Sequence, residues 1–579
     1  MERFATIRPM PPFWRNGQTM KRFFFLANLC AVAAMSATAA DVTISKPYFR
    51  WLFNGFGFQN SEANFLRIMP EDFRDQRVLK TFRELSPSFA RVYTGFADST
   101  KEELDSFADY YDLTFRGAQT TLYAVPCAMP ILPDTLDPEA YAEKVAKNLA
   151  YLVNVRTCRK IRYYCLTNEL MAGERWGWFS REKKWDLYKA YNAALFHAFR
   201  RHGLDIRLLA TDESSTPDKV WTGLEWVRDN MNDYVGAFCS HWYVDGRTDD
   251  LTLWQQYNDF FDRAVQFARK AANKRYILGE WGFRPAPERS TVMVDDTNYH
   301  LRQPETRGES VLAKCEIGLA AMNNGAVACV DWSFVDYPDP FVVEDGDSDE
   351  EKAWYAAGRS GWRLDGKYNK WGVFRWSSVD RDYAAYEELY AVGWLAKLFR
   401  KNATVLPCTF ADPMLRGGAI FNADRSVSIA LINRGPAKTV TVDCSTWQTR
   451  TDGTPSLHQP LRRIVYEAAN PPLNAFNDLQ AASGTVTATG GVFTVALPAK
   501  SMTFLTTDYI DRTPPAVGGV ELKGGVLSWT ASTGPAHVYY RVYRDGVQIA
   551  STVATRLDVK GAKGDYAVRS VDRWNNVGR

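Results

Sequence analysis

Histidine and net charge are both scarce in this chain. Only 6 of its 579 residues are histidine, and no HExxH or similar cluster of metal-ligating side chains occurs. Lys and Arg number 70 against 67 Asp and Glu, which leaves a formal net charge of +3. This balance provides no electrostatic basis for binding nucleic acid or an anionic membrane surface. We therefore expect no metal, no cofactor and no nucleic acid partner.

Closely spaced cysteine pairs are also missing. The 9 cysteines form no CxxC motif, and Cys165, Cys239 and Cys329 lie inside apolar strand-like runs. Buried free thiols are therefore expected in place of a disulfide framework. Cys30 fits a lipoprotein anchor poorly, because Leu29 stands where a small residue is usual.

Apart from the N-terminus, the chain has no long hydrophobic run. There the basic pair Lys21-Arg22 precedes the apolar stretch Phe23–Met35, and small residues follow up to Ala40. This order predicts a secretory signal peptide, and the apolar stretch is too short for a membrane span. Residues 1–40 are expected to be the signal peptide with an upstream extension, Met20 being a candidate for the true start. The protein is expected to be secreted or periplasmic in a bacterium, with the cell surface as a further alternative.

Strand-like and helix-like segments alternate through the first two thirds of the chain. Short apolar runs are separated by longer amphipathic stretches, and this rhythm predicts parallel strands joined by helical crossovers. We expect an α/β fold, a (β/α)8 TIM barrel over residues 41–400. The expected strands are Arg50–Phe58, Phe89–Thr94, Thr120–Cys127, Ile161–Leu166, Ile206–Thr211, Val235–Tyr243, Arg275–Glu280 and Ala326–Ser333.

The last third of the chain has a different pattern. Residues 401–510 contain short alternating runs separated by Gly, Asn and Pro, which predicts an all-β sandwich domain. Thr513-Pro514-Pro515 predicts a stiff linker. Residues 511–579 are expected to form a second sandwich, a fibronectin type III or immunoglobulin-like module.

Two glutamates stand where a predicted strand gives way to a loop. Glu169 follows the fourth strand in Thr167–Leu170, and Glu280 ends the seventh in Leu278–Trp281. The C-terminal ends of barrel strands converge on one pocket, so these carboxyl groups could face one substrate. Glycoside cleavage uses such a pair, one as acid and the other as nucleophile or base. Either glutamate alone would more often be an ion-paired surface group, so the hypothesis depends on the pair.

Other candidate site residues occupy the same ends of their strands. Arg91 and Tyr243 could hold Glu280 ionised, although Arg91 also suits a structural role as the partner of a barrel carboxylate. His241 could be a site residue or a hydrogen-bonded core histidine. Asp212-Glu213 suits a pocket rim or a helix cap, and the acid pair of an unusual site is the alternative. Further candidates for substrate binding are Asn168, Trp281, Trp332, Trp176 and Trp178, of which the last two also suit loop anchors.

Long segments follow the seventh and eighth strands. Residues 284–307 and 336–380 would lie at the C-terminal rim of the barrel, where active sites are built. The second segment contains the acidic run 344–351. This run suits a solvated loop, and the alternative of calcium binding lacks a full EF-hand spacing.

Taken in order, these residues resemble the retaining glycoside hydrolases of clan A. The matching positions are Asn168-Glu169, His241-Trp242-Tyr243, Glu280 and Trp332, together with Arg91. The resemblance covers residues 47–400. It implies that Glu169 is the acid/base and Glu280 the nucleophile. It further implies that the asparagine binds the sugar 2-hydroxyl and that the tyrosine hydrogen-bonds the nucleophile.

The family within the clan is left open among families 5, 30 and 39. His241-Trp242-Tyr243 looks like family 5, but Ala124–Cys127 stands where that family usually has a histidine. Phe53–Phe58 resembles a family 30 first strand, and Leu497–Ser501 resembles the sandwich of families 30 and 39. The end of the chain is similar to fibronectin type III modules of secreted bacterial enzymes.

The chain is therefore expected to be a secreted retaining glycoside hydrolase. It would cleave a β-linked oligo- or polysaccharide by double displacement, with this carbohydrate as its partner. The alternative is a non-catalytic carbohydrate-binding protein on a barrel scaffold, which the two intact glutamates argue against. The sequence leaves the sugar, the linkage and the oligomeric state open.

Overall fold

The computed structural model of the chain places most residues after the N-terminal segment. It describes residues 40–579 except 47–51, 61–70, 127–136, 171–183, 214–216, 246–249, 285–307, 336–371, 375–383, 448–456, 458 and 535. The expected signal peptide, the acidic run 344–351, Trp176 and Trp178 lie outside the described residues. Within the described ranges, no helix is both long and apolar enough to cross a membrane.

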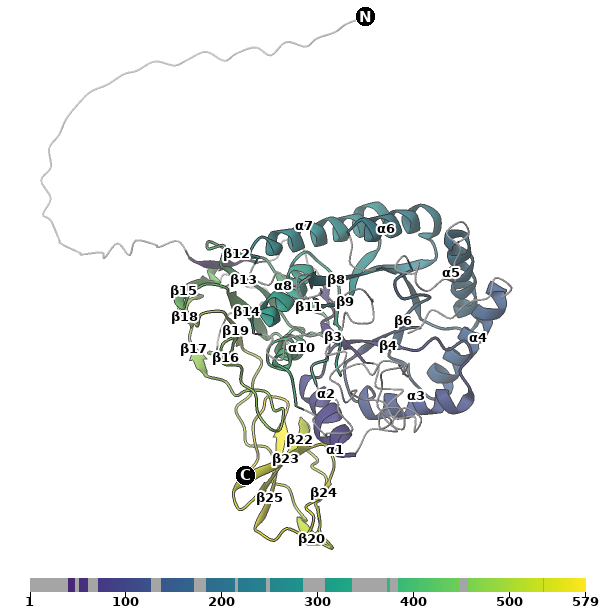
Figure 1. Ribbon diagram of the computed structural model, residues 1–579. Coiled ribbons are helices and arrows are strands. Elements are labelled where there is room, and N and C mark those ends of the chain that lie inside the picture. Colours follow the sequence, from purple (N-terminus) through teal and green to yellow (C-terminus); the bar gives the residue numbers. More distant parts are fainter. Residues whose placement is uncertain are drawn as a thin grey trace, which may run out of the picture. The chain divides into compact units, whose positions relative to one another are not determined.

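Parallel strands close into a barrel, which confirms the expected fold class (Figure 1). The hydrogen-bonded order around the barrel is β10-β3-β4-β5-β6-β7-β8-β9, and each strand overlaps one of the expected runs. The strands are β3 (Phe56–Gln59), β4 (Phe89–Tyr93), β5 (Thr121–Val125), β6 (Ile161–Cys165), β7 (Arg207–Glu213), β8 (Val235–Asp245), β9 (Arg275–Arg284) and β10 (Cys329–Asp331).

Helices follow the barrel strands, and α3 to α7 run along its outside (Figure 1). Local sequence determines where some of them begin. Thr100 caps α3 in a capping box with Glu103, and Asp137 caps α4 with Pro138 in the first turn. The helical segments are α1 (Glu71–Phe73), η2 (Arg74–Val78), α2 (Leu79–Leu85), α3 (Lys101–Thr114), α4 (Pro138–Ala150), η3 (Tyr151–Val155), α5 (Lys184–Arg201), α6 (Pro217–Met231), α7 (Leu253–Gln266), η4 (Phe267–Ala271), α8 (Glu309–Asn323), η7 (Glu387–Tyr390), α10 (Val392–Leu398) and η8 (Ser445–Trp447).

Apolar side chains fill the interior of the barrel. Phe89, Tyr123 and Ile277 belong to one buried cluster of strand residues. Cys165 and Cys239 lie in the same cluster as free thiols, as expected. A filled interior confines any pocket to an end of the barrel.

Two short strands that precede the barrel in sequence belong to the sandwich. β1 (Val42–Ile44) pairs with strands of one sheet, and β2 (Leu52–Phe53) pairs with β11 of the other. The expected first strand, Arg50–Phe58, therefore contains the separate strands β2 and β3. A four-stranded sheet has the order β12-β1-β15-β18, and a seven-stranded sheet has the order β17-β16-β19-β14-β13-β11-β2. The other sandwich strands are β11 (Ala403–Leu406), β12 (Cys408–Phe410), β13 (Leu415–Phe421), β14 (Val427–Asn433), β15 (Lys438–Asp443), β16 (Leu461–Glu467), β17 (Gly484–Val486), β18 (Val492–Leu497) and β19 (Ser501–Thr506).

The C-terminal module consists of two three-stranded sheets, ordered β20-β21-β24 and β23-β22-β25. Its small core includes Trp529 and Tyr540. The fibronectin type III relationship stays a prediction. The strands are β20 (Glu521–Lys523), β21 (Val526–Ser528), β22 (His537–Arg544), β23 (Val547–Thr552), β24 (Arg556–Asp558) and β25 (Tyr566–Asp572).

Buried ion pairs also involve residues of α8. Lys314 lies 2.8 Å from Asp331 of β10, and both side chains are almost completely buried. Glu316 lies 3.1 Å from Arg416 of the sandwich. Such pairs keep buried charges compensated.

Candidate active site

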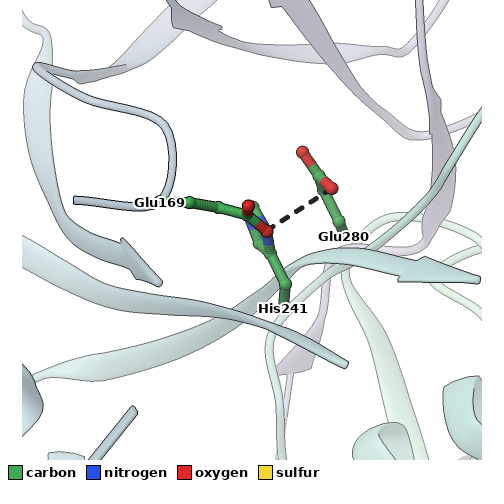
Figure 2. Close-up of side chains that lie close together, drawn as sticks. All are labelled: Glu169, His241 and Glu280. Atoms are coloured by element: carbon green, nitrogen blue, oxygen red, sulfur yellow. Dashed lines mark hydrogen bonds and ion pairs between the residues drawn. The ribbon is translucent and has the colours of Figure 1, made fainter. Parts of the chain in front are cut away.

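Five predicted site residues come together at the carboxyl ends of the barrel strands. Arg91 lies on β4, Glu169 follows β6, His241 and Tyr243 lie on β8, and Glu280 lies on β9. The side chains of Glu169, His241 and Glu280 point toward one another (Figure 2). One oxygen from each carboxyl group and one histidine nitrogen all lie within 4.8 Å of one another. The geometric requirement for a two-carboxylate site is therefore met.

A shift in strand register turns Glu280 into the site. Ser240 of β8 pairs with Leu278, but the next residue, His241, pairs with Glu280, so the shift falls at Gly279. A Cβ atom at Gly279 would lie 2.7 Å from Asp212 Oδ1. Glycine is needed at this point because Asp212 and the thiol of Cys239 on the neighbouring strand β8 already occupy the space of a side chain.

Strong donors surround the Glu280 carboxyl group. Arg91 donates to Oε1 at 2.5 Å and the Tyr243 hydroxyl donates to Oε2 at 2.5 Å. The side chain of Glu280 is only 5% exposed. The pKa of Glu280 is raised above its ordinary value, mainly by burial, while the charges of His241 and Arg91 oppose that rise. These donors favour the ionised form that a nucleophile requires.

The Glu169 carboxyl group is more open. Its side chain is 27% exposed, and its Oε1 lies 2.8 Å from Nδ1 of His241. The residue adopts a left-handed backbone conformation with φ of 51°, and its peptide N–H donates to the carbonyl oxygen of Asp212 at 2.8 Å. Glu169 thus combines a fixed backbone with access to solvent, as a group that exchanges protons with a substrate needs.

His241 is fully buried with carboxylates at both ring nitrogens. Nε2 lies 2.9 Å from Asp212 Oδ1, while Nδ1 lies 2.8 Å from Glu169 and 3.4 Å from Glu280. Burial alone would lower the pKa of His241, but the Glu280 and Asp212 carboxylates raise it to about 10. The ring is therefore an imidazolium at neutral pH, able to donate from both nitrogens.

Arg91 donates hydrogen bonds to several residues of the site. Besides Glu280, its guanidinium donates to Asp212 at 2.8 Å, to Gln59 at 3.0 Å and to Asn168 at 2.5 Å. The side chain is completely buried. The structural role considered for Arg91 is therefore present, and Arg91 also contacts the candidate nucleophile directly.

Trp332 lies at the site, whereas Trp281 does not. Trp332 packs edge-to-face on Tyr93 at 5.4 Å. Trp281 is completely buried and packs against Phe56 at 5.8 Å. Neighbouring residues of a strand point to opposite faces, so Trp281 faces the outer layer while Glu280 faces the mouth. The prediction that Trp281 contacts sugar is therefore wrong. The predicted residues that lie together at the mouth are Arg91, Asn168, Glu169, His241, Tyr243, Glu280 and Trp332.

Asp212 is a site residue that the sequence reasoning misplaced. Its side chain is completely buried between Arg91 and His241, so it is neither an exposed rim group nor a helix cap. Gln59, at the end of β3, was missed altogether. Asp212 and Gln59 could have been found from their positions at the carboxyl ends of barrel strands, because the same rule selected the two glutamates.

The donor set suits acid–base chemistry better than metal binding. Glu169, His241 and Glu280 supply three potential ligand atoms within 4.8 Å of one another. A metal-bound histidine must be neutral at the coordinating nitrogen. Neighbouring carboxylates instead keep His241 protonated, and the permanent charge of Arg91 lies 2.5 Å from Glu280. Arg91 and His241 already supply the positive charge that the buried carboxylates of Asp212 and Glu280 need.

Comparison with known proteins identifies the fold. No protein-family model matches the chain, and no curated protein matches its sequence. Solved structures that match include the endo-beta1,6-glucanase BT3312, with a TM-score of 0.51 and 16% identity over 80% of this chain and 94% of that chain. AbfB, a family 51 alpha-L-arabinofuranosidase from Bifidobacterium longum, has a TM-score of 0.51 and 14% identity over 81% of this chain and 100% of that chain.

The catalytic domain of family 30 xylanase C from Talaromyces cellulolyticus has a TM-score of 0.50 and 12% identity, over 80% of this chain and 99% of that chain. At such identities the likeness establishes the fold alone. The chain therefore shares its fold with these solved structures, a closed barrel of parallel strands followed by β domains.

Proposed function

We propose that this chain is a secreted retaining glycoside hydrolase that cleaves β-linked oligo- or polysaccharides by double displacement. The observation that supports this most is the approach of Glu169 and Glu280, whose nearest oxygens lie within 4.8 Å. Retaining enzymes hold their carboxyl groups about 5–5.5 Å apart, whereas inverting enzymes leave about 6.5–9.5 Å for a water molecule. The short separation favours direct attack by one carboxylate.

In the first step, Glu280 attacks the anomeric carbon and Glu169 protonates the leaving oxygen. The bond from the anomeric carbon to that oxygen breaks as the bond to the Glu280 carboxylate forms. The assignment of the two roles follows from their surroundings. Glu280 is buried among the donors Arg91 and Tyr243, whereas Glu169 is partly exposed and can reach a leaving group.

In the second step, Glu169 removes a proton from a water molecule whose oxygen attacks the anomeric carbon, and the bond from that carbon to Glu280 breaks. The sugar leaves with its original anomeric configuration, and Glu280 is released as a carboxylate. His241 Nδ1 lies within hydrogen-bond distance of Glu169, so it can hold this carboxyl group in place through both proton transfers. Trp332 and Asn168 would contact the sugar, the tryptophan by stacking on its C–H face.

The experiment is a panel of aryl β-glycosides and β-linked polysaccharides, tested with the purified chain. We expect turnover of at least one substrate, and NMR of the first-formed product should show a retained anomeric configuration. Inversion would overturn the mechanism. Binding without turnover across the panel would favour the non-catalytic carbohydrate-binding alternative. Secretion is proposed from the N-terminal segment, and N-terminal sequencing of protein recovered outside the cytoplasm tests it by placing the cleavage near Ala40.

A further inference from the structure

Asp212 is a buried carboxylate of the site that the two-step mechanism leaves unused. It lies near the end of β7, where the register with β8 shifts between Thr211 and Glu213. Asp212 itself has a left-handed φ of 53° and a completely buried side chain. A buried carboxylate on a strained backbone would lower the stability of the fold if it had no compensating contacts.

Those contacts lead to the supports of both candidate catalytic groups. Oδ1 lies 2.9 Å from His241 Nε2 and Oδ2 accepts from Arg91 at 2.8 Å. The carbonyl oxygen accepts from the peptide N–H of Glu169 at 2.8 Å. His241 in turn contacts Glu169, and Arg91 in turn contacts Glu280. A single residue therefore connects Asp212 to each candidate catalytic carboxyl group: His241 connects it to Glu169, and Arg91 connects it to Glu280.

We propose that Asp212 is a positioning residue that fixes the His241 ring and the Arg91 guanidinium, and thereby directs Glu169 and Glu280 toward one anomeric carbon. This inference rests on the proposed function. Asp212 is a third carboxylate, which the two-carboxylate mechanism does not include, and it acts without touching the substrate.

The charges in the site explain why a carboxylate is needed here. Arg91 and His241 are cationic, and Asp212 and Glu280 are their anionic partners, so these four buried charges cancel. Without the Asp212 charge, the buried His241 ring would lose part of what keeps it protonated. A neutral ring carries one N–H and cannot donate from both nitrogens. The hydrogen bond that orients Glu169 would then depend on the tautomer.

The surrounding backbone also reserves space for this carboxylate. A side chain at Gly279 would approach Asp212 Oδ1 to 2.7 Å. The thiol of Cys239 donates to the same oxygen at 3.2 Å. Gly279 of β9 thus leaves room for the Asp212 side chain, and Cys239 of β8 provides a hydrogen-bond donor to it.

The first test is Asp212→Asn, which keeps the size and the backbone carbonyl but removes the charge. We expect kcat to fall by about 10²-fold or more, as for other residues that orient a catalytic group. The alkaline limb of the kcat profile should move to lower pH, because His241 loses its proton more readily. Asp331→Asn is the matched control. It removes another buried carboxylate, the partner of Lys314 at 2.8 Å, and should reduce stability without moving the pH profile.

The second test does not depend on turnover. Histidine NMR with ¹⁵N labelling of the full chain should show both nitrogens of His241 protonated at pH 8, and His241→Gln assigns the signal among the 6 histidines. Asp212→Asn should convert that signal to a neutral ring. Asp212→Glu keeps the charge but displaces it, so it should retain the protonated signal while kcat falls.

The outcomes separate this inference from the proposed function. If the wild type hydrolyses glycosides and Asp212→Asn keeps both its kcat and its pH profile, the positioning role is overturned and the function stands. If the wild type hydrolyses nothing, the proposed function fails. The NMR signal then tests independently whether Asp212 keeps the His241 ring protonated. An unchanged signal in Asp212→Asn would overturn the positioning role.

Discussion

Replacing Arg91 with methionine should weaken the fold and disable Glu280 in one change. The guanidinium is completely buried and donates to Glu280 at 2.5 Å and to Asp212 at 2.8 Å. Methionine preserves most of the apolar stem and removes the charge and all the donors. The two carboxylates would then face each other's charge with only His241 between them as a cation.

The expected magnitudes follow from these contacts. Removing one partner of a buried ion pair costs about 3–5 kcal/mol, because the other charge stays buried and uncompensated. The hydrogen bond from Arg91 to Glu280 joins two charged groups, and a hydrogen bond of this kind contributes about 1.5–3 kcal/mol. If this stabilisation of the ionised nucleophile is lost, kcat/KM should fall by about 10- to 150-fold. Loss of a nearby positive charge raises the pKa of Glu280 further, so the acid limb of kcat/KM should move to higher pH.

The assay is kcat/KM against pH with an activated aryl β-glycoside, together with urea unfolding. Arg91→Lys keeps a charge but loses the planar set of donors, so it should fall between the wild type and Arg91→Met. Arg416→Met is the matched control, because Arg416 is also buried and lies 3.1 Å from Glu316. It should reduce stability and leave the acid limb in place. An unmoved acid limb and an unchanged urea midpoint in Arg91→Met would refute the reasoning.

Three further predictions concern the same site. Glu280→Gln should lower kcat by at least about 10⁴-fold, while Glu169→Ala should slow turnover by about 10²–10⁴-fold and recover partly with azide; full activity in either variant would contradict the assignment. Dialysis against EDTA should leave kcat unchanged, and a loss restored by a divalent cation would favour a metal site instead. The pKa of His241 is raised from 6.5 to about 10 in the folded protein. Its contribution to the free energy of unfolding should therefore be complete below pH 6.5 and decline toward pH 10. Urea midpoints of the wild type and His241→Gln should accordingly converge as the pH rises, and a constant difference would count against this linkage.

Much of the barrel and of its site could be predicted because both follow from local patterns. Buried parallel strands are short apolar runs separated by amphipathic helices, so their positions can be found without knowing their partners. The functional groups of barrel enzymes lie at the carboxyl ends of strands, and this rule located the candidate site residues Glu169, Glu280 and His241. The alternation of side chains along a strand would also have excluded Trp281, since it follows an inward-facing Glu280.

The sequence by itself thus determined the order of strands and helices, the barrel class, and which strand ends carry carboxyl groups. Tertiary structure alone decided the partners that are distant in sequence. Leu52 pairs with Thr404 in the sandwich although its pattern continues into the first barrel strand. Asp212 is a buried partner of His241 and Arg91 only because neighbouring and opposite strands bring these groups together. The physical reason is that strand pairing, burial and charge compensation depend on which segments meet in space, and no local pattern of residues specifies that meeting.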